Sequence, residues 1–200
     1  ACLLACPVGV ALKGVQDIGA LSPGETVLVT GAGGGLGVHA VQVARLLGAR
    51  VLAVTTSPTK AEGLRQAGAH EVLEASGPRF SDVVMALTAD RGVDLVVDTV
   101  GSPLFLQALE CLAQYGRVVV LGEVTGRPVS LNLAEILFRD ARILAASGVS
   151  RQHVARAAEL VARGDLTPVV TRTLSLEEAD RAYQMASQRQ LLGRAVIVPW

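Results

Sequence analysis

The stretch 26-TVLVTGAGGGLGVHAVQVARLLGARVLAVTTS-57 joins a short β-branched run to a glycine-rich turn, a helical pattern and a second apolar run. A tight turn of this kind disfavours a Cβ, and glycine lets the backbone approach a phosphate closely. The N–H groups and the positive dipole end of the following helix favour an anion. The stretch predicts a strand–turn–helix unit that binds a dinucleotide. The expected contacts are Gly33, Gly34, Gly35, Leu36 and Gly37.

Two other interpretations of this turn stay open. It fits a glycine-rich connection without a ligand, and it fits a site for another nucleotide-like molecule such as S-adenosylmethionine. The context favours a dinucleotide, because further strand–helix units follow the turn along the chain.

The rest of the chain alternates short apolar runs with amphipathic segments. The expected strands are residues 26–30, 50–55, 71–74, 93–98, 117–121, 141–146 and 194–198. The expected helices are residues 36–48, 59–67, 79–89, 102–113, 132–138, 151–163 and 176–187. Alternation of this kind implies right-handed crossovers and a mainly parallel sheet. We predict an α/β protein with a Rossmann doubly wound parallel six-stranded sheet, helices on both faces, a leading helix at residues 1–20 and one domain over residues 1–200.

The composition excludes several classes of protein. Half of the residues are hydrophobic and only 3% are aromatic, which suits aliphatic strands buried on both faces. A formal net charge of zero argues against a nucleic-acid footprint. Neither a membrane span nor a signal peptide is visible. Three cysteines do not make a disulfide framework, so we expect a cytoplasmic protein.

The end of the second expected strand predicts the cofactor type. NAD enzymes usually place an acidic residue there to hold the ribose 2′-hydroxyl. Here the strand runs into small hydroxyl residues and one of the chain's two lysines, with no carboxylate. A 2′-phosphate needs room, hydroxyl donors and a cation, so we expect NADP(H). The proposed contacts are Thr55, Thr56, Ser57 and Lys60.

The glycines fit two dehydrogenase patterns. As Thr-Gly-x-x-x-Gly-x-Gly, the turn resembles that of short-chain dehydrogenases, which need a tyrosine and a lysine four residues apart. Tyr115 is followed four places later by Val119, and Tyr183 by Ser187. No Tyr-x-x-x-Lys exists, and the resemblance ends at the turn.

The second pattern resembles the medium-chain dehydrogenase/reductase family, which includes zinc-type alcohol dehydrogenases, quinone oxidoreductases and acryloyl-CoA reductase-like enzymes. The resemblance covers nearly the whole chain. It is carried by residues 22–29 (SPGETVLV), 31–37 (GAGGGLG) with 40–44 (AVQVA), 92–101 (GVDLVVDTVG), 116–122 (GRVVVLG) and 192–199 (LGRAVIVP). Strands of an open α/β sheet bind ligand at their carboxyl ends. Further cofactor contacts are therefore expected at Val100, Gly101, Leu121 and Gly122, whereas Asp98 is expected to orient its loop.

The resemblance implies hydride transfer between NADP(H) and a small-molecule substrate, either a carbonyl or alcohol or an activated C=C. It also implies an N-terminal GroES-like catalytic domain that is absent from this chain, so we expect the chain alone to be inactive. Cys6 resembles a zinc ligand of the family, and zinc is a candidate metal in the intact protein. A stand-alone NADP(H)-binding module and an enoyl reductase domain of a multidomain synthase stay open, although the start at Ala1 favours a portion of a longer protein.

Two further expectations concern the surface. His39, His70 and His153 are expected to be surface or capping histidines, because no Cys or His lies at ligand spacing from them. Family dimers often join edge strands, and residues 141–146 (ARILAA) could be such an edge. We therefore expect a homodimer.

Overall fold

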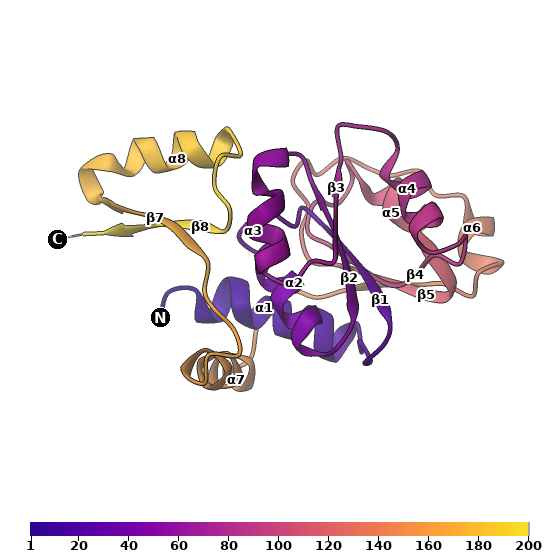
Figure 1. Ribbon diagram of the computed structural model, residues 1–200, viewed down its shortest axis with the longest axis horizontal. Coiled ribbons are helices and arrows are strands. Elements are labelled where there is room, and N and C mark those ends of the chain that lie inside the picture. The colour runs from indigo at the N-terminus through magenta and orange to yellow at the C-terminus, as the bar shows by residue number, and fades with distance from the viewer. Residues whose placement is uncertain (200) are drawn as a thin grey trace.

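A computed structural model describes residues 1–199 and has a six-stranded parallel sheet at its centre (Figure 1). The strand order is β3-β2-β1-β4-β5-β6, so the order reverses between β1 and β4. The strands are β1 (Thr26–Thr30), β2 (Arg50–Thr55), β3 (Glu71–Glu74), β4 (Val93–Asp98), β5 (Leu112–Val120) and β6 (Arg142–Ala145). This arrangement confirms the predicted fold.

Helices cover both faces of the sheet. One face packs against α2 (Gly37–Leu46), α3 (Ala61–Gln66), α7 (Arg151–Ala162) and the leading helix. The other face packs against α4 (Phe80–Leu87) and α5 (Phe105–Glu110), with α6 (Leu133–Leu137) at its margin. All five β1 side chains are buried, and Val27, Leu28 and Val29 alternate between the two cores. Burial on both faces explains the continuous apolar strands of the sequence.

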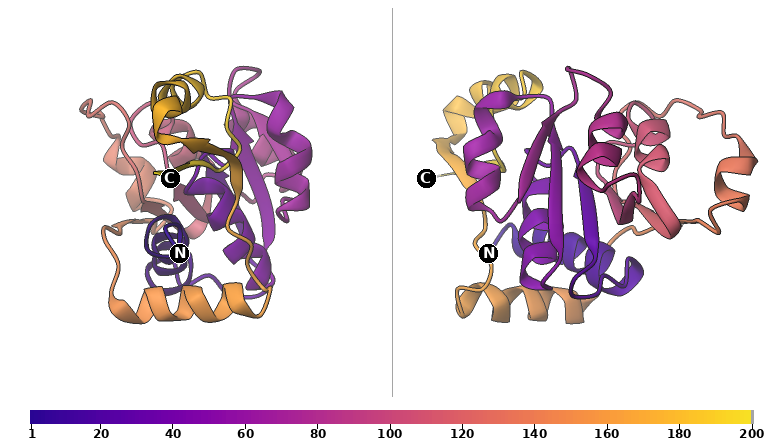
Figure 2. Two further views of the ribbon diagram at one scale, coloured as in Figure 1. Left: turned by 90° about the vertical axis from the view of Figure 1, so that its left-hand side faces the viewer. Right: turned by 45° about the vertical axis from the view of Figure 1, so that its right-hand side comes forward.

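The leading helix is wound unevenly. It consists of a wide-turn segment (Leu4–Gly9), α1 (Val10–Leu12) and a second wide-turn segment (Lys13–Ile18). Pro7 lies inside the first segment, and Cys6 has an extended backbone there. The ring of a proline disfavours the helical conformation of the residue before it, which accounts for the extended backbone of Cys6. Figure 2 shows this helix lying beside α7.

The end of the chain differs from the expectation. A strand that the sequence did not predict, β7 (Val170–Ser175), pairs in parallel with β8 (Arg194–Val198) in a separate two-stranded sheet. A short 3₁₀ turn (Leu176–Glu178) and α8 (Ala179–Ser187) connect them. β8 therefore does not join the main sheet, and Figure 1 shows this unit at the opposite end of the molecule from α6.

The predicted helix 102–113 is also too long. α5 ends at Glu110, and β5 already begins at Leu112. Tyr115 takes a positive φ of 61° within β5, and the register against β4 shifts between Val93 and Leu95. This irregular start explains why the sequence pattern predicted the strand only from residue 117 onward. In the described part of the chain, no helix has the length and hydropathy needed to cross a membrane.

Candidate functional site

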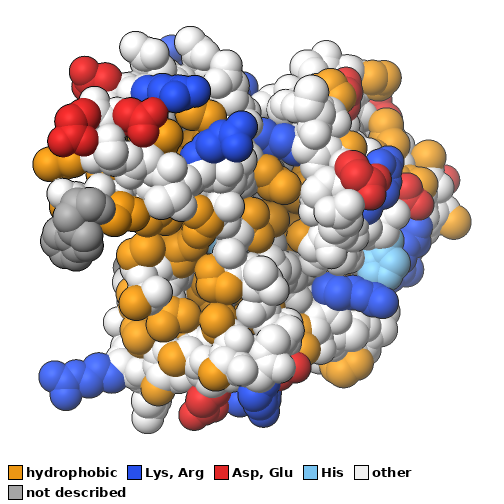
Figure 3. Space-filling view, turned by 60° about the vertical axis from the view of Figure 1, so that its left-hand side comes forward, with side chains coloured by type: hydrophobic (Ala, Val, Ile, Leu, Met, Phe, Trp, Pro, Cys, Tyr) orange, Lys and Arg blue, Asp and Glu red, His pale blue; other side chains and the backbone are white. Residues whose placement is uncertain are grey.

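A cavity of about 1080 Å³ opens at the carboxyl ends of β1, β2 and β4. Its walls are the glycine loop (residues 31–36), the loops after these strands, and the segment from α8 to β8. The cavity lies where the strand order reverses, the usual ligand position in an open α/β sheet. Figure 3 shows this side of the molecule hollowed, with apolar side chains in the hollow and lysine and arginine side chains along its upper rim.

Eight of the residues predicted to contact cofactor line this cavity. They are Gly33, Gly34, Gly35, Leu36, Thr55, Thr56, Lys60 and Val100. Five others lie outside its wall, namely Gly37, Ser57, Gly101, Leu121 and Gly122.

The glycine loop is too crowded for side chains at several positions. Gly31 has a φ of 60°, and a Cβ there would lie 2.7 Å from Val100 Cγ2. A Cβ on Gly37 would lie 2.6 Å from Ala32 Cα, so this glycine permits the close approach of α2 to the loop. No side chain caps the start of α2. The positive end of the α2 dipole and the N–H groups of its first turn can therefore stabilise a bound anion.

The end of β2 forms a polar corner. Thr55 is 4% exposed, and its Oγ1 accepts a hydrogen bond from Ser57 N at 3.2 Å. The Ser57 hydroxyl is paired with Thr59 Oγ1 at 2.9 Å, at the margin of the corner. Lys60 is 8% exposed and its Nζ donates to Gly33 O at 3.5 Å. Burial, followed by the nearby charge of Arg189, lowers the pKa of Lys60.

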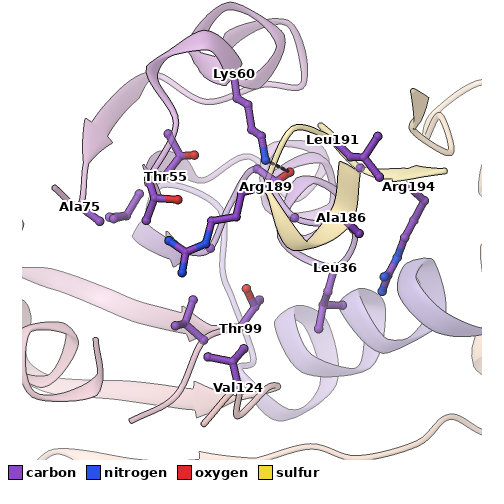
Figure 4. Close-up of a pocket in the computed structure, with 18 of the residues that line it drawn as sticks. Leu36, Thr55, Lys60, Ala75, Thr99, Val124, Ala186, Arg189, Leu191 and Arg194 are labelled. Atoms are coloured by element: carbon purple, nitrogen blue, oxygen red, sulfur yellow. Dashed lines mark hydrogen bonds between the residues drawn. The ribbon is translucent and has the colours of Figure 1, made fainter. Parts of the chain in front are cut away.

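Two charged residues of the cavity were not predicted from the sequence, Arg189 after α8 and Arg194 at the start of β8. Figure 4 shows the Arg189 side chain directed between Thr55 and Thr99, and the Arg194 side chain beside Leu36. A Cβ on Gly35 would lie 2.6 Å from Arg194 Cζ, so the guanidinium lies directly over the loop.

The electrostatics of the cavity are one-sided. Lys60, Arg189 and Arg194 line it, and among the described residues no aspartate or glutamate does. Burial lowers the pKa of Lys60 most, and the like charge of Arg189 lowers it further. An anion bound among them would relieve this repulsion.

Asp98 is fully buried at the end of β4 and forms hydrogen bonds to the ends of the neighbouring strands β1 and β5. Its Oδ1 accepts from Val100 N and Gly101 N, each at 3.0 Å, and from Thr30 Oγ1 at 2.5 Å. Its carbonyl accepts from Leu121 N at 2.7 Å. Asp98 therefore orients its loop, as expected.

Leu121 and Gly122 follow β5, outside the cavity wall. Leu121 Cδ2 lies close to Gly14 of the leading helix. A Cβ on Gly122 would lie 2.5 Å from Thr99 O, which explains the need for glycine at this close approach.

The expectation for His39 was wrong. His39 is 1% exposed, its Nδ1 lies 2.6 Å from Gly35 O, and its Nε2 accepts from Val169 N at 3.0 Å. It therefore connects the glycine loop to the segment before β7. Burial lowers the pKa of His39, and the Arg194 charge lowers it further. The hydrogen bond to Gly35 O acts in the opposite direction and raises it. The Gly35 carbonyl and the Val169 amide require a neutral ring protonated at Nδ1.

The other two histidines agree with the expectation. His153 completes a capping box with Ser150 at the start of α7, and its Nε2 lies 2.7 Å from Asp17 Oδ2. His70 accepts a hydrogen bond from Val51 N at 2.9 Å.

The described residues do not form a zinc site by themselves. Cys6 is exposed and free, and residues 1–199 hold no group of three or more His, Cys, Asp or Glu side chains suited to a metal. A catalytic zinc needs three protein ligands, and Cys6 could supply only one of them.

Comparisons with known proteins agree with this architecture. Residues 35–163 match the family model for zinc-binding dehydrogenase. Acryloyl-coenzyme A reductase of Sulfurisphaera tokodaii is 35% identical over 200 residues, which cover 100% of this chain and 58% of that protein. NAD-dependent alcohol dehydrogenase of Saccharolobus solfataricus is 30% identical over 181 residues, which cover 90% of this chain and 52% of that protein.

The crystal structure of AibC superposes with a TM-score of 0.91 at 40% identity, covering 98% of this chain and 55% of that one. The chain thus spans a little more than half the length of the relatives it matches. With the family model extending over most of the sheet, the chain belongs to the zinc-binding dehydrogenase family.

Proposed function

We propose that this chain binds NADP(H) and that the protein containing it transfers hydride between this cofactor and a small-molecule substrate. The observation that carries the proposal is the cavity with three cations and, within the described residues, no carboxylate. NAD enzymes usually hold the ribose with an acidic side chain at the end of β2, where this chain has Thr55 and Thr56.

The proposed contacts follow the path of a dinucleotide across the reversal point. The pyrophosphate lies on residues 33–37 at the start of α2, with Arg194 above it. The 2′-phosphate lies among Thr55, Thr56, Ser57 and Lys60, and Arg189 adds a second cation there. The nicotinamide half lies over β4 and β5, next to Val100, Gly101, Leu121 and Gly122.

The bound cofactor supplies the hydride chemistry, and the protein positions it and keeps water away. The substrate is a carbonyl or alcohol, or an activated C=C. Relatives named acryloyl-coenzyme A reductase, 2-haloacrylate reductase and quinone oxidoreductase support reduction of an activated double bond or quinone, and a relative named alcohol dehydrogenase supports the other reaction. Activity of the full-length gene product on crotonyl- or acryloyl-CoA, with none on alcohols, would decide for the double bond.

We also propose that the protein is a homodimer joined through β6, the last strand of the sheet. Ile143 of β6 is 40% exposed, and Leu133, Leu137 and Phe138 expose apolar side chains nearby in the chain. An edge strand with apolar side chains needs a covering partner.

The cofactor proposal is tested by titrating the protein with NADPH and NADH while following nicotinamide fluorescence. Tighter binding of NADPH, and its displacement by 2′-phospho-AMP, are the expected results. Tighter binding of NADH would refute the assignment of the β2 corner to a phosphate.

A further inference from the structure

Glu123 is an exposed carboxylate with an unusual number of donors around it. Its Oε1 accepts from Thr125 N at 2.8 Å, from Gly126 N at 2.9 Å and from Ser102 Oγ at 2.8 Å. Its Oε2 accepts from Ser102 N at 2.7 Å. These backbone and hydroxyl donors lower the pKa of Glu123 from its usual 4.5 to about 2.

These bonds hold two loops together. Residues 123–126, here called the β5 loop, follow β5, and residues 99–104 follow β4. Val124 N also donates to Val100 O at 3.0 Å. Gly101 lies between the loops with a φ of 80°, and a Cβ there would lie 2.9 Å from Glu123 Cα. The two loops therefore meet without an intervening side chain.

The joined loops form one wall of the cavity. Thr99 and Val100 line it from the first loop, and Val124 and Thr125 line it from the β5 loop. Figure 4 shows Thr99 and Val124 across the cavity from Lys60. Val124 is 65% exposed although it is apolar, so hydrogen bonds rather than side-chain packing hold this part of the wall in place. The Glu123 bonds are joined by the Val124 N–Val100 O bond and by the contact of Ser102 Oγ with Thr125 Oγ1 at 2.6 Å.

We propose that Glu123 is a positioning residue for the nicotinamide half of the cofactor. This inference rests on the proposed function. A dinucleotide that crosses the reversal point places its adenosine half over β2 and its other half over β4 and β5. The β5 loop lies beside the second half, and Glu123, which does not itself line the cavity, fixes the loop through its hydrogen bonds. The adenosine half, held at Thr55 and Lys60, does not depend on it.

The test is Glu123→Gln in the full-length gene product. Glutamine keeps one acceptor oxygen but presents an NH₂ group where the other oxygen stood, so Ser102 N or the β5 loop loses its acceptor. Dissociation constants are measured for NADPH and for adenosine 2′,5′-bisphosphate, which lacks the nicotinamide half. Glu159→Gln on α7 is the control, because Glu159 pairs with Arg156 at the surface.

We expect Glu123→Gln to weaken NADPH binding roughly tenfold and bisphosphate binding less than twofold, since one bond to a charged acceptor is lost. Ser102→Ala, which removes one of the donors, should shift the ratio in the same direction by a smaller factor. Equal weakening of both ligands would assign Glu123 a purely structural role, and unchanged NADPH binding would also overturn the inference. If the wild-type protein binds the bisphosphate but not NADPH, the inference about Glu123 is wrong while the proposed 2′-phosphate contacts stand. If it binds neither ligand, the inference and the proposed 2′-phosphate contacts are both wrong.

Discussion

Replacing Lys60 with methionine removes one charge from the cavity and keeps most of the side-chain volume. The Lys60 stem lies against the glycine loop, where a Cβ on Gly33 would lie 2.6 Å from its Cδ. Methionine fills this space, whereas alanine would leave it empty. Lys13→Met is a matched control, because Lys13 is the chain's other lysine and its Nζ donates to Ser147 O at 2.7 Å, away from the cavity.

The expected magnitude follows from the neighbours of Lys60. A hydrogen bond to a charged group contributes about 1.5–3 kcal/mol. Each 1.4 kcal/mol or so changes a dissociation constant about tenfold. Arg189 lies close enough to lower the pKa of Lys60 and remains in the variant to pair with the phosphate. The loss should therefore lie near the lower limit, about tenfold for NADPH and within about twofold for NADH.

The assay is a fluorescence titration of both cofactors with the wild-type protein and the two variants at pH 7 and fixed ionic strength. Lys13→Met should match the wild type for both cofactors. Equal weakening of NADPH and NADH by Lys60→Met would mean that Lys60 supports the glycine loop through Gly33 O rather than the 2′-phosphate. If the wild type prefers NADPH and Lys60→Met binds both cofactors as well as the wild type does, the 2′-phosphate contact would be assigned to the arginines instead.

Three further predictions concern stability and assembly. The pKa of buried His39 is lowered below its usual 6.5, so the unfolded chain binds this proton more readily than the folded chain. The contribution of neutral His39 to the free energy of unfolding is therefore complete above pH 6.5 and is lost as the pH falls below it. In urea unfolding from pH 8 to 5, the free energy of unfolding should depend less on pH in His39→Gln than in the wild type. Gly37→Ala should lower the free energy of unfolding by about 1–3 kcal/mol, because its Cβ meets the backbone at Ala32; an unchanged urea midpoint would contradict this packing. Ile143→Glu should convert a dimer to a monomer in light scattering at micromolar concentration, and a wild type that is already monomeric would refute the β6 interface.

Local chemistry made most of the main sheet predictable. The strands β1 to β4 and the glycine loop were recognisable because each combines a short apolar run with nearby turn residues. β7 was not, because its sequence VTRTLS is mostly exposed and lacks the apolar run of a buried strand. β8 was recognised as a strand, but a pattern of apolar residues does not specify which strand it pairs with.

The same distinction applies to the site. Lys60 lies 27 residues from Gly33 and only five residues after the end of β2. Its position beside the glycine loop could therefore be inferred from the order of elements. The positions of Arg189 and Arg194 depend on how a separate strand pair returns to the glycine loop, as shown by Gly193 N donating to Gly33 O at 3.3 Å. His39 was misplaced for a related reason, because its partner Val169 lies 130 residues away.

Net charge also concealed the character of the cavity. The chain carries 18 basic and 18 acidic residues, which correctly argued against a broad basic surface for nucleic acid. Several surface arginines are paired with nearby acids, as in Arg156–Glu159 and Arg181–Glu178. The cavity instead gathers three cations and, in its described lining, no acid. A neutral chain can therefore present a concentrated positive field at one place, and an anionic cofactor responds to this local field rather than to the sum.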